Sequence, residues 1–147
     1  MKGKAFQLPD EVCRLILEHG CTIRGMTPED LLACTRFYEM DRLQEEIYDT
    51  LYSGSIYGAC TSKDIIEIDG DRLPEIRNNP KKWAPRIWHE LVHNAQRHEE
   101  GDAKFNISYL SQWVFKAGWI GKRWKRVISY EREAYAEQTA FSMRMGG

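Results

Sequence analysis

The five residues His89-Glu90-Leu91-Val92-His93 form the pattern H-E-x-x-H. On an α-helix, residues four apart lie on the same face, so these two imidazoles could bind one metal ion. Glu90 would lie on a neighbouring face, where its carboxylate can take a proton from a water in the metal's open coordination position. The motif therefore predicts a hydrolytic zinc site with His89 and His93 as ligands and Glu90 as general base.

The segment around this motif has the periodicity of a helix that is buried on one side. Its apolar side chains share one arc at about 100° per residue. They are Ile87, Trp88, Leu91, Val92 and Ala95. His89 and His93 lie beside that arc with Gln96, so we expect them half-buried at the floor of a cleft. Pro85 suits a first helical turn, so the predicted helix runs from about residue 85 to residue 98 and ends before Gly101.

A catalytic zinc ion usually takes three protein ligands and leaves one position open, so a third ligand is required. His98 lies roughly 140–180° around the helix from the histidine pair, which places it on another side. Glu99 follows His93 by six residues, where one class of zincins has its third ligand. That class has a turn-forming Gly where this chain has Gln96. His98 and Glu99 are therefore less favoured than an acidic residue from elsewhere in the chain.

The last predicted helix offers acidic residues next to small ones, in the sequence Y-E-R-E-A-Y-A-E of residues 130–137. A small residue lets two helices approach closely, and a carboxylate beside it can reach the metal. Glu131 and Glu133 are about 200° apart on a helix, so only one of them can face the histidines. Taken alone, the segment is also typical of a solvated helix face. After H-E-x-x-H, it is predicted to supply the third ligand.

Together these residues resemble the pattern of the gluzincin metallopeptidases, and most of all their smallest members, the minigluzincins. That pattern combines H-E-x-x-H on one helix with a Glu on a later helix. In this comparison His89 and His93 match the metal-binding histidines, and Glu90 matches the catalytic glutamate. In that pattern a small residue commonly follows the later Glu three positions on. Glu131 matches the third ligand, because Ala134 then occupies that position. The resemblance implies a zincin-like fold, a bound Zn²⁺ and hydrolysis of peptide bonds in a peptide or protein substrate.

The chain departs from this pattern at Tyr135, where many gluzincins carry Asp or Asn to orient a ligand histidine. Glu133, which is followed four residues later by Glu137, therefore stays an alternative third ligand.

The resemblance also implies an edge strand before the motif helix, which would bind extended peptide by strand addition. Residues 65–68 are in the right order to be that strand, although they fit a plain sheet strand with Glu67 outward equally well. Tyr109, Tyr130 and Tyr135 are candidate donors to a developing oxyanion, or else core and rim aromatics.

The pattern of elements predicts an α+β fold, mainly helical, with a small sheet or hairpin packed on the motif helix. We expect one domain over residues 1–147, with a helical N-terminal part (1–54) and a zincin-like catalytic core (55–141). The predicted helices outside the motif are 10–20, 28–51 with a break or bend, 105–115 and 127–143, and the predicted strands are 56–60 and 65–68.

Composition narrows the class of protein. With 42% hydrophobic and 29% charged residues, the chain reads as globular. A net charge of −1 provides no field for nucleic acid or an anionic membrane, so neither partner is expected. No apolar stretch fits a signal peptide or a membrane span, so we expect a cytoplasmic protein in which the four cysteines are reduced and mostly packed.

Two other functions remain open. The chain could be a metal-binding or non-peptidase hydrolase domain with a restricted or closed cleft. A chain of this length has few residues left over to form the sides of a substrate-binding cleft. Residues 116–126 interleave basic and aromatic side chains as nucleic-acid surfaces do, although a loop over the cleft is the favoured interpretation.

Overall fold

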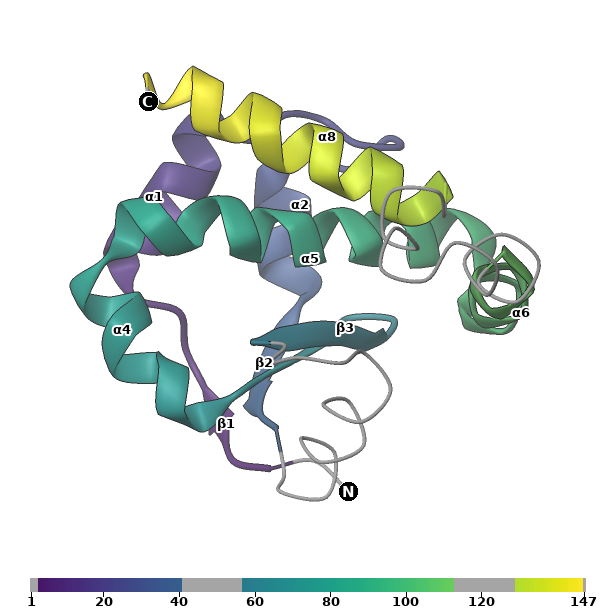
Figure 1. Cartoon of the computed structure of the whole chain (residues 1–147), viewed down its shortest axis with the longest axis horizontal. Coiled ribbons are helices and arrows are strands. Elements are labelled where there is room, and N and C mark those ends of the chain that lie inside the picture. Colours follow the sequence, from purple (N-terminus) through teal and green to yellow (C-terminus); the bar gives the residue numbers. More distant parts are fainter. Residues whose placement is uncertain (1–2, 41–56, 113–128, 147) are drawn as a thin grey trace.

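The computed structural model describes residues 3–40, 57–112 and 129–146. Its fold is α+β, as predicted, with helices stacked on one small mixed sheet (Figure 1). The strands are β1 (Ala5–Phe6), β2 (Arg36–Glu39), β3 (Gly58–Ser62) and β4 (Ile65–Ile68). The helices are α1 (Asp10–His19), α2 (Pro28–Cys34), α4 (Leu73–Asn78), α5 (Pro80–Glu100), α6 (Asp102–Gln112) and α8 (Ser129–Arg144), with a 3₁₀ turn at Gly70–Arg72.

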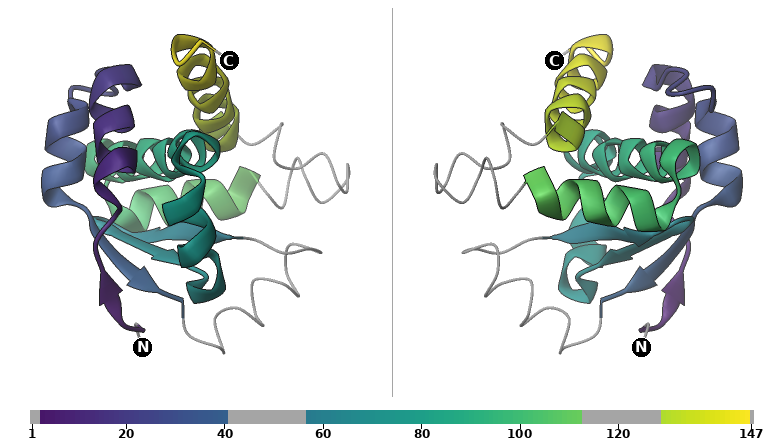
Figure 2. Two further views of the ribbon diagram at one scale, coloured as in Figure 1. Left: turned by 90° about the vertical axis from the view of Figure 1, so that its left-hand side faces the viewer. Right: turned by 90° about the vertical axis from the view of Figure 1, so that its right-hand side faces the viewer.

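The motif helix α5 is the centre of the molecule. It packs against α8 and α1 on one side and against β3 on the other, so it lies between a helical layer and the sheet (Figures 1 and 2). The predicted apolar arc is confirmed, since all five of its side chains are fully buried. The helix begins at Pro80, not near Pro85 as predicted, because Pro80 takes the first helical position and Pro85 is accepted inside the helix. It ends before Gly101, whose φ of +84° suits glycine.

The sheet has the order β1-β2-β4-β3, and two predictions about it were wrong. Residues 36–39 were expected to continue a helix, but they form β2, which pairs in parallel with β4. As a result β4 lies inside the sheet, so it is a plain sheet strand, the second of the two interpretations, and not an edge strand that could bind peptide. Glu67 is buried at 2% exposure and does not point outward to solvent. Among the described strands, β3 is the edge next to α5.

The N-terminal part is therefore not purely helical. The predicted start of α2 is confirmed, because Thr27 accepts a hydrogen bond from the Asp30 amide while Asp30 accepts one from the Thr27 amide. The helix then stops at Cys34, since Thr35 is extended and begins the path into β2. The C-terminal half of the helix predicted over 28–51 lies outside the described residues, as does the basic and aromatic stretch 116–126.

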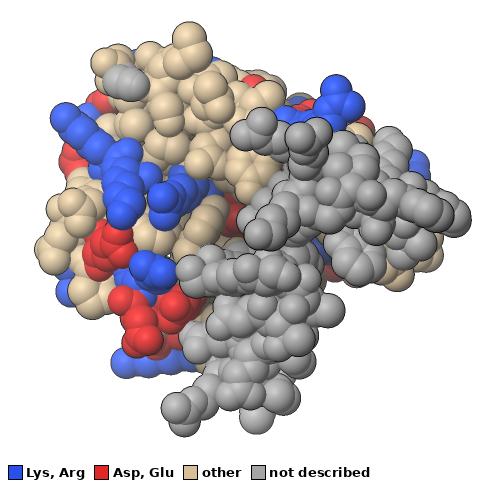
Figure 3. Space-filling model, viewed as in Figure 1, with Lys and Arg blue, Asp and Glu red and all other residues tan. Residues whose placement is uncertain are grey.

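The described residues also show the surroundings of the cysteines and the distribution of charge. All four cysteines are free; Cys60 is buried, and the other three are partly exposed. On the face seen in Figure 3, Lys and Arg side chains lie next to Asp and Glu side chains. Of the helices that the structure describes, none combines the length and the hydropathy that crossing a membrane requires.

Candidate metal centre

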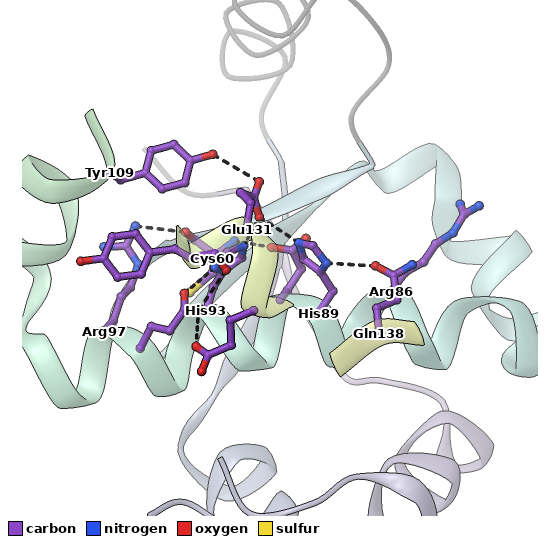
Figure 4. A network of polar contacts seen from close by, with 12 residues as sticks. Cys60, Arg86, His89, His93, Arg97, Tyr109, Glu131 and Gln138 are labelled. Atoms are coloured by element: carbon purple, nitrogen blue, oxygen red, sulfur yellow. Dashed lines mark hydrogen bonds and ion pairs between the residues drawn. The ribbon is translucent and has the colours of Figure 1, made fainter. Parts of the chain in front are cut away.

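His89 and His93 from α5 and Glu131 from the first turn of α8 converge in the interior; we call them the His89 cluster (Figure 4). Glu131 Oε1 lies 2.5 Å from His93 Nε2 and 3.1 Å from His89 Nε2. One ligand atom from each residue lies within 4.8 Å of the other two. The three residues are only 4%, 6% and 7% exposed, so the two histidines are buried and not half-buried as predicted.

The path of α8 explains why Glu131 reaches the histidines. α8 runs antiparallel to α5, because Gln138 meets His89 while Tyr130 meets Gln96 further along α5. Ala134, one turn after Glu131, is fully buried. It shares a face of α8 with Glu131 and Gln138, which both contact α5, so its small side chain agrees with the predicted close approach of the helices.

Glu133 points to a different set of partners. Its carboxylate accepts a hydrogen bond from Gln96 Nε2 at 2.7 Å and pairs with Arg24 at 3.0 Å. Arg24 also pairs with Glu99 at 2.8 Å, so Glu99 is directed away from the histidines. His98 bonds to Asp64 on another side of α5, in agreement with the helical geometry. Of the acidic candidates, the structure therefore brings only Glu131 to the histidine pair.

The donor set fits a tetrahedral divalent cation. Zinc bonds of about 2.0–2.2 Å to nitrogen and oxygen imply separations of about 3.3 Å between two ligand atoms. The separation of 3.1 Å from His89 is close to this value, whereas the 2.5 Å from His93 is that of a hydrogen bond, which must lengthen when a cation replaces the proton. Two imidazole nitrogens and one carboxylate oxygen are also the ligand types of many catalytic zinc sites.

The other ring nitrogen of each histidine is held by a glutamine. His93 Nδ1 lies 2.7 Å from Gln96 Oε1. The orientation of this amide is fixed, because Gln96 Nε2 donates to the Tyr130 carbonyl at 3.0 Å as well as to Glu133. His93 Nδ1 must therefore donate its proton to Gln96, so Nε2 is the ring nitrogen that can exchange a proton for a metal inside the cluster.

His89 has the corresponding arrangement. Its Nδ1 lies 2.9 Å from Gln138 Oε1, so its Nε2 also faces Glu131 (Figure 4). This role was expected to require Asp or Asn at position 135. Instead, the Tyr135 ring packs against His89 with centroids 4.5 Å apart, and Gln138 on the next turn supplies the oxygen. Hydrogen bonds of this kind orient metal-binding histidines and fix their tautomer.

The charges of His93 and Glu131 depend on each other in the His89 cluster. Burial disfavours the charged form of His93, but the Glu131 carboxylate and its hydrogen bond together raise the pKa of His93 to about 9. Burial likewise opposes ionisation of Glu131, but His93 and His89 hold the pKa of Glu131 well below its usual range. A proton shared by His93 Nε2 and Glu131 Oε1 thus lies at the centre of the cluster, where a cation would replace it.

Glu90 lies on the sheet side of α5, where two donors hold its carboxylate. The Cys60 amide donates to Oε1 at 3.2 Å, and the Tyr57 hydroxyl lies 2.9 Å from Oε2 and 2.8 Å from the Arg86 carbonyl. Burial and the nearby Glu90 charge raise the pKa of Tyr57 well above its usual value, so Tyr57 stays a donor. Glu90 is near enough to the metal ligands that its charge also raises the pKa of His93.

The three candidate oxyanion donors lie in different surroundings. Tyr109 on α6 donates to Glu131 Oε2 at 3.2 Å, so its hydroxyl contacts the His89 cluster directly (Figure 4). Tyr130 bonds to Glu100 at 2.5 Å, which directs its hydroxyl to the end of α5. The ring of Tyr135 packs against His89, so Tyr109 and Tyr135 both border the cluster, and Tyr109 contacts it through its hydroxyl.

The sequence analysis missed two residues that orient the site. Gln138 lies seven residues after Glu131, which is two helical turns along the same face, so helical spacing could have identified it. Tyr57 precedes β3 and reaches Glu90 only through the packing of β3 on α5, so no local pattern marks it.

Comparisons with protein-family models, with curated proteins and with solved structures found no match to this chain.

Proposed function

We propose that this protein is a zinc-dependent hydrolase that cleaves peptide bonds. One observation carries the proposal. The two histidines of H-E-x-x-H and Glu131 meet in one buried cluster, and at both imidazoles Nδ1 lies within hydrogen-bonding distance of a glutamine oxygen. This leaves both Nε2 atoms directed at one point, as metal binding requires. The gluzincin-like pattern of the sequence supports a peptide substrate.

Each residue would have a distinct role. His89, His93 and Glu131 would hold Zn²⁺, which supplies Lewis acidity that lowers the pKa of water towards about 7 and polarises a carbonyl group. Glu90, oriented by Cys60 N–H and the Tyr57 hydroxyl, would accept a proton from the attacking water and deliver it to the leaving nitrogen. Tyr109 would donate a hydrogen bond to the developing oxyanion.

Removal and return of the metal test this function. The zinc-loaded protein should cleave members of a quenched fluorescent peptide library, a chelator should abolish cleavage, and added Zn²⁺ should restore it. Fluorescence release and bound zinc are measured on the same samples. Full zinc occupancy without cleavage of any peptide would contradict the peptidase function.

That outcome would favour a second candidate, a metal-binding or non-peptidase hydrolase domain with a closed cleft, for which the β3 edge gives a specific reason. A peptide that adds to this edge needs free backbone groups. At Cys60 the amide is taken by Glu90 and the carbonyl accepts from Arg97, each at 3.2 Å. Strand addition at the centre of β3 would have to displace both α5 side chains.

Replacement of Gln138 by Leu tests the orienting role of this glutamine. The change removes the oxygen that accepts from His89 Nδ1, so zinc affinity should fall about 10–100-fold. Gln138→Glu restores an acceptor and should recover most of the affinity. Both variants are measured by competition with a zinc-binding dye. Equal affinities for Gln138→Leu and the unchanged protein would show that Gln138 does not support the ligand.

A further inference from the structure

A second group of metal-ligating side chains lies outside the His89 cluster. Cys34 at the end of α2, Asp64 in the turn between β3 and β4, and His98 on α5 converge, and we call them the Cys34 cluster. His98 Nε2 lies 2.5 Å from Asp64 Oδ1 and 3.7 Å from Cys34 Sγ. One ligand atom from each residue lies within 4.8 Å of the other two.

The two clusters occupy different sides of the same helix. Five residues separate His93 from His98, which corresponds to about 140° around α5. The His89 cluster faces α8, whereas the Cys34 cluster faces the β3–β4 turn and the end of α2. Binding of a cation at the Cys34 cluster would therefore not depend on the proposed hydrolase site.

A thiol, an imidazole and a carboxylate could also form a nucleophilic triad, but the geometry does not fit one. In a triad, one ring nitrogen of the histidine serves the nucleophile and the other is held by the acid. Here Cys34 Sγ and Asp64 Oδ1 both approach the same atom, His98 Nε2. Three donors that converge on one point are the arrangement of a metal site, and sulfur with nitrogen and oxygen ligands suits Zn²⁺.

The separations also fit a cation. Zinc bonds of about 2.3 Å to sulfur and about 2.0 Å to nitrogen and oxygen imply N···S and N···O separations of about 3.6 Å and 3.3 Å. The observed N···S distance of 3.7 Å matches, and the N···O distance of 2.5 Å is that of a hydrogen bond which a cation would replace. The side chains of His98 and Asp64 are 25% and 34% exposed, so solvent can reach a fourth position.

A buried asparagine holds the ligands in place. Asn94 is fully buried, and its Nδ2 lies 3.1 Å from Asp64 Oδ1 and 3.9 Å from Cys34 Sγ. Its Oδ1 accepts a hydrogen bond from the Asp64 amide at 2.7 Å. Asp64 itself has a φ of +66°, which few residues other than Gly, Asn and Asp adopt. The turn is thus shaped so that a carboxylate stands beside His98.

We propose that Cys34, Asp64 and His98 form a second binding site for a thiophilic divalent cation such as Zn²⁺. The cation would join α2, the β3–β4 turn and α5. This turn joins β3 to β4. The cation would therefore also fix β3, whose Cys60 amide holds Glu90.

Titration with Co²⁺ separates the two sites, because only the Cys34 cluster contains a thiolate ligand. The unchanged protein should bind two equivalents of Co²⁺, and one of them should produce a thiolate-to-Co²⁺ charge-transfer band in the near ultraviolet. Cys34→Ser should lose the band and one equivalent. Cys13→Ser and His93→Ala should keep the band, since neither residue belongs to the Cys34 cluster.

Asp64→Asn provides a variant that keeps the turn, because Asn also adopts a positive φ. The affinity for the Co²⁺ that gives the band should fall more than about 100-fold, because loss of an anionic ligand costs more than the 10–100-fold of outer-shell changes. Circular dichroism establishes that each variant is folded. A band that persists in Cys34→Ser, or a folded unchanged protein without the band, would overturn the second site. If His93→Ala lost Co²⁺ and Cys34→Ser lost none, all binding would belong to the His89 cluster, and the second site would likewise be overturned.

Discussion

Glu90→Gln should keep bound zinc and lose peptide hydrolysis by about 10²–10⁴-fold, the contribution expected of a general base. The amide cannot accept the proton of water, but it fits the same space. Its oxygen can accept from the Cys60 amide, and its nitrogen can donate to the Tyr57 hydroxyl, whose own proton goes to the Arg86 carbonyl. Metal analysis and initial rates on the best cleaved peptide measure the two effects.

Glu99→Gln is the matched control for this experiment. Glu99 is also on α5, but its partner is Arg24 at the exposed end of the helix, so the rate should be unchanged. A metal-loaded Glu90→Gln protein with the activity of the unchanged chain would refute Glu90 as the base.

Glu131→Gln should lower zinc affinity more than about 100-fold, because removal of an anionic ligand costs more than the 10–100-fold of outer-shell changes. The same replacement at Glu133, two residues along α8, should keep zinc. A glutamine there still has an oxygen that can accept from Gln96 Nε2, so the orientation of His93 is preserved.

Competition with a zinc-binding dye gives both affinities, and thermal unfolding without metal checks that each variant folds. Zinc loss in Glu133→Gln together with retention in Glu131→Gln would reverse the assignment of the third ligand.

Local periodicity accounts for the part of the site that could be predicted. The spacing of His89 and His93, the buried arc beside them and the distance around the helix to His98 all follow from 3.6 residues per turn. The preference for Glu131 over Glu133 came from the family resemblance, through the small Ala134, and α8 does lie close to α5 at that residue. Whether these ligands hold zinc stays a prediction.

Pairing between distant segments accounts for most of what could not be predicted. Arg36–Glu39 becomes β2 because it pairs with β4 in parallel and with β1 antiparallel, and the pairing with β4 also removes β4 from the edge. The His89 cluster is also covered by α6, because the Tyr109 hydroxyl on this helix donates a hydrogen bond to Glu131. The Cys34 cluster draws on three segments that are each at least 30 residues apart, so no spacing in the sequence reveals it.

The central place of α5 has a consequence for protein turnover. This helix contacts α1, α2, α4, α6, α8 and β3, so it cannot open without disrupting most of the described fold. A cation on His89 and His93 would therefore stabilise the whole molecule, by about 4 kcal/mol when free metal is about 1,000 times its dissociation constant. Metal starvation would then expose the chain to proteases, and the supply of zinc would set how much of the protein a cell retains.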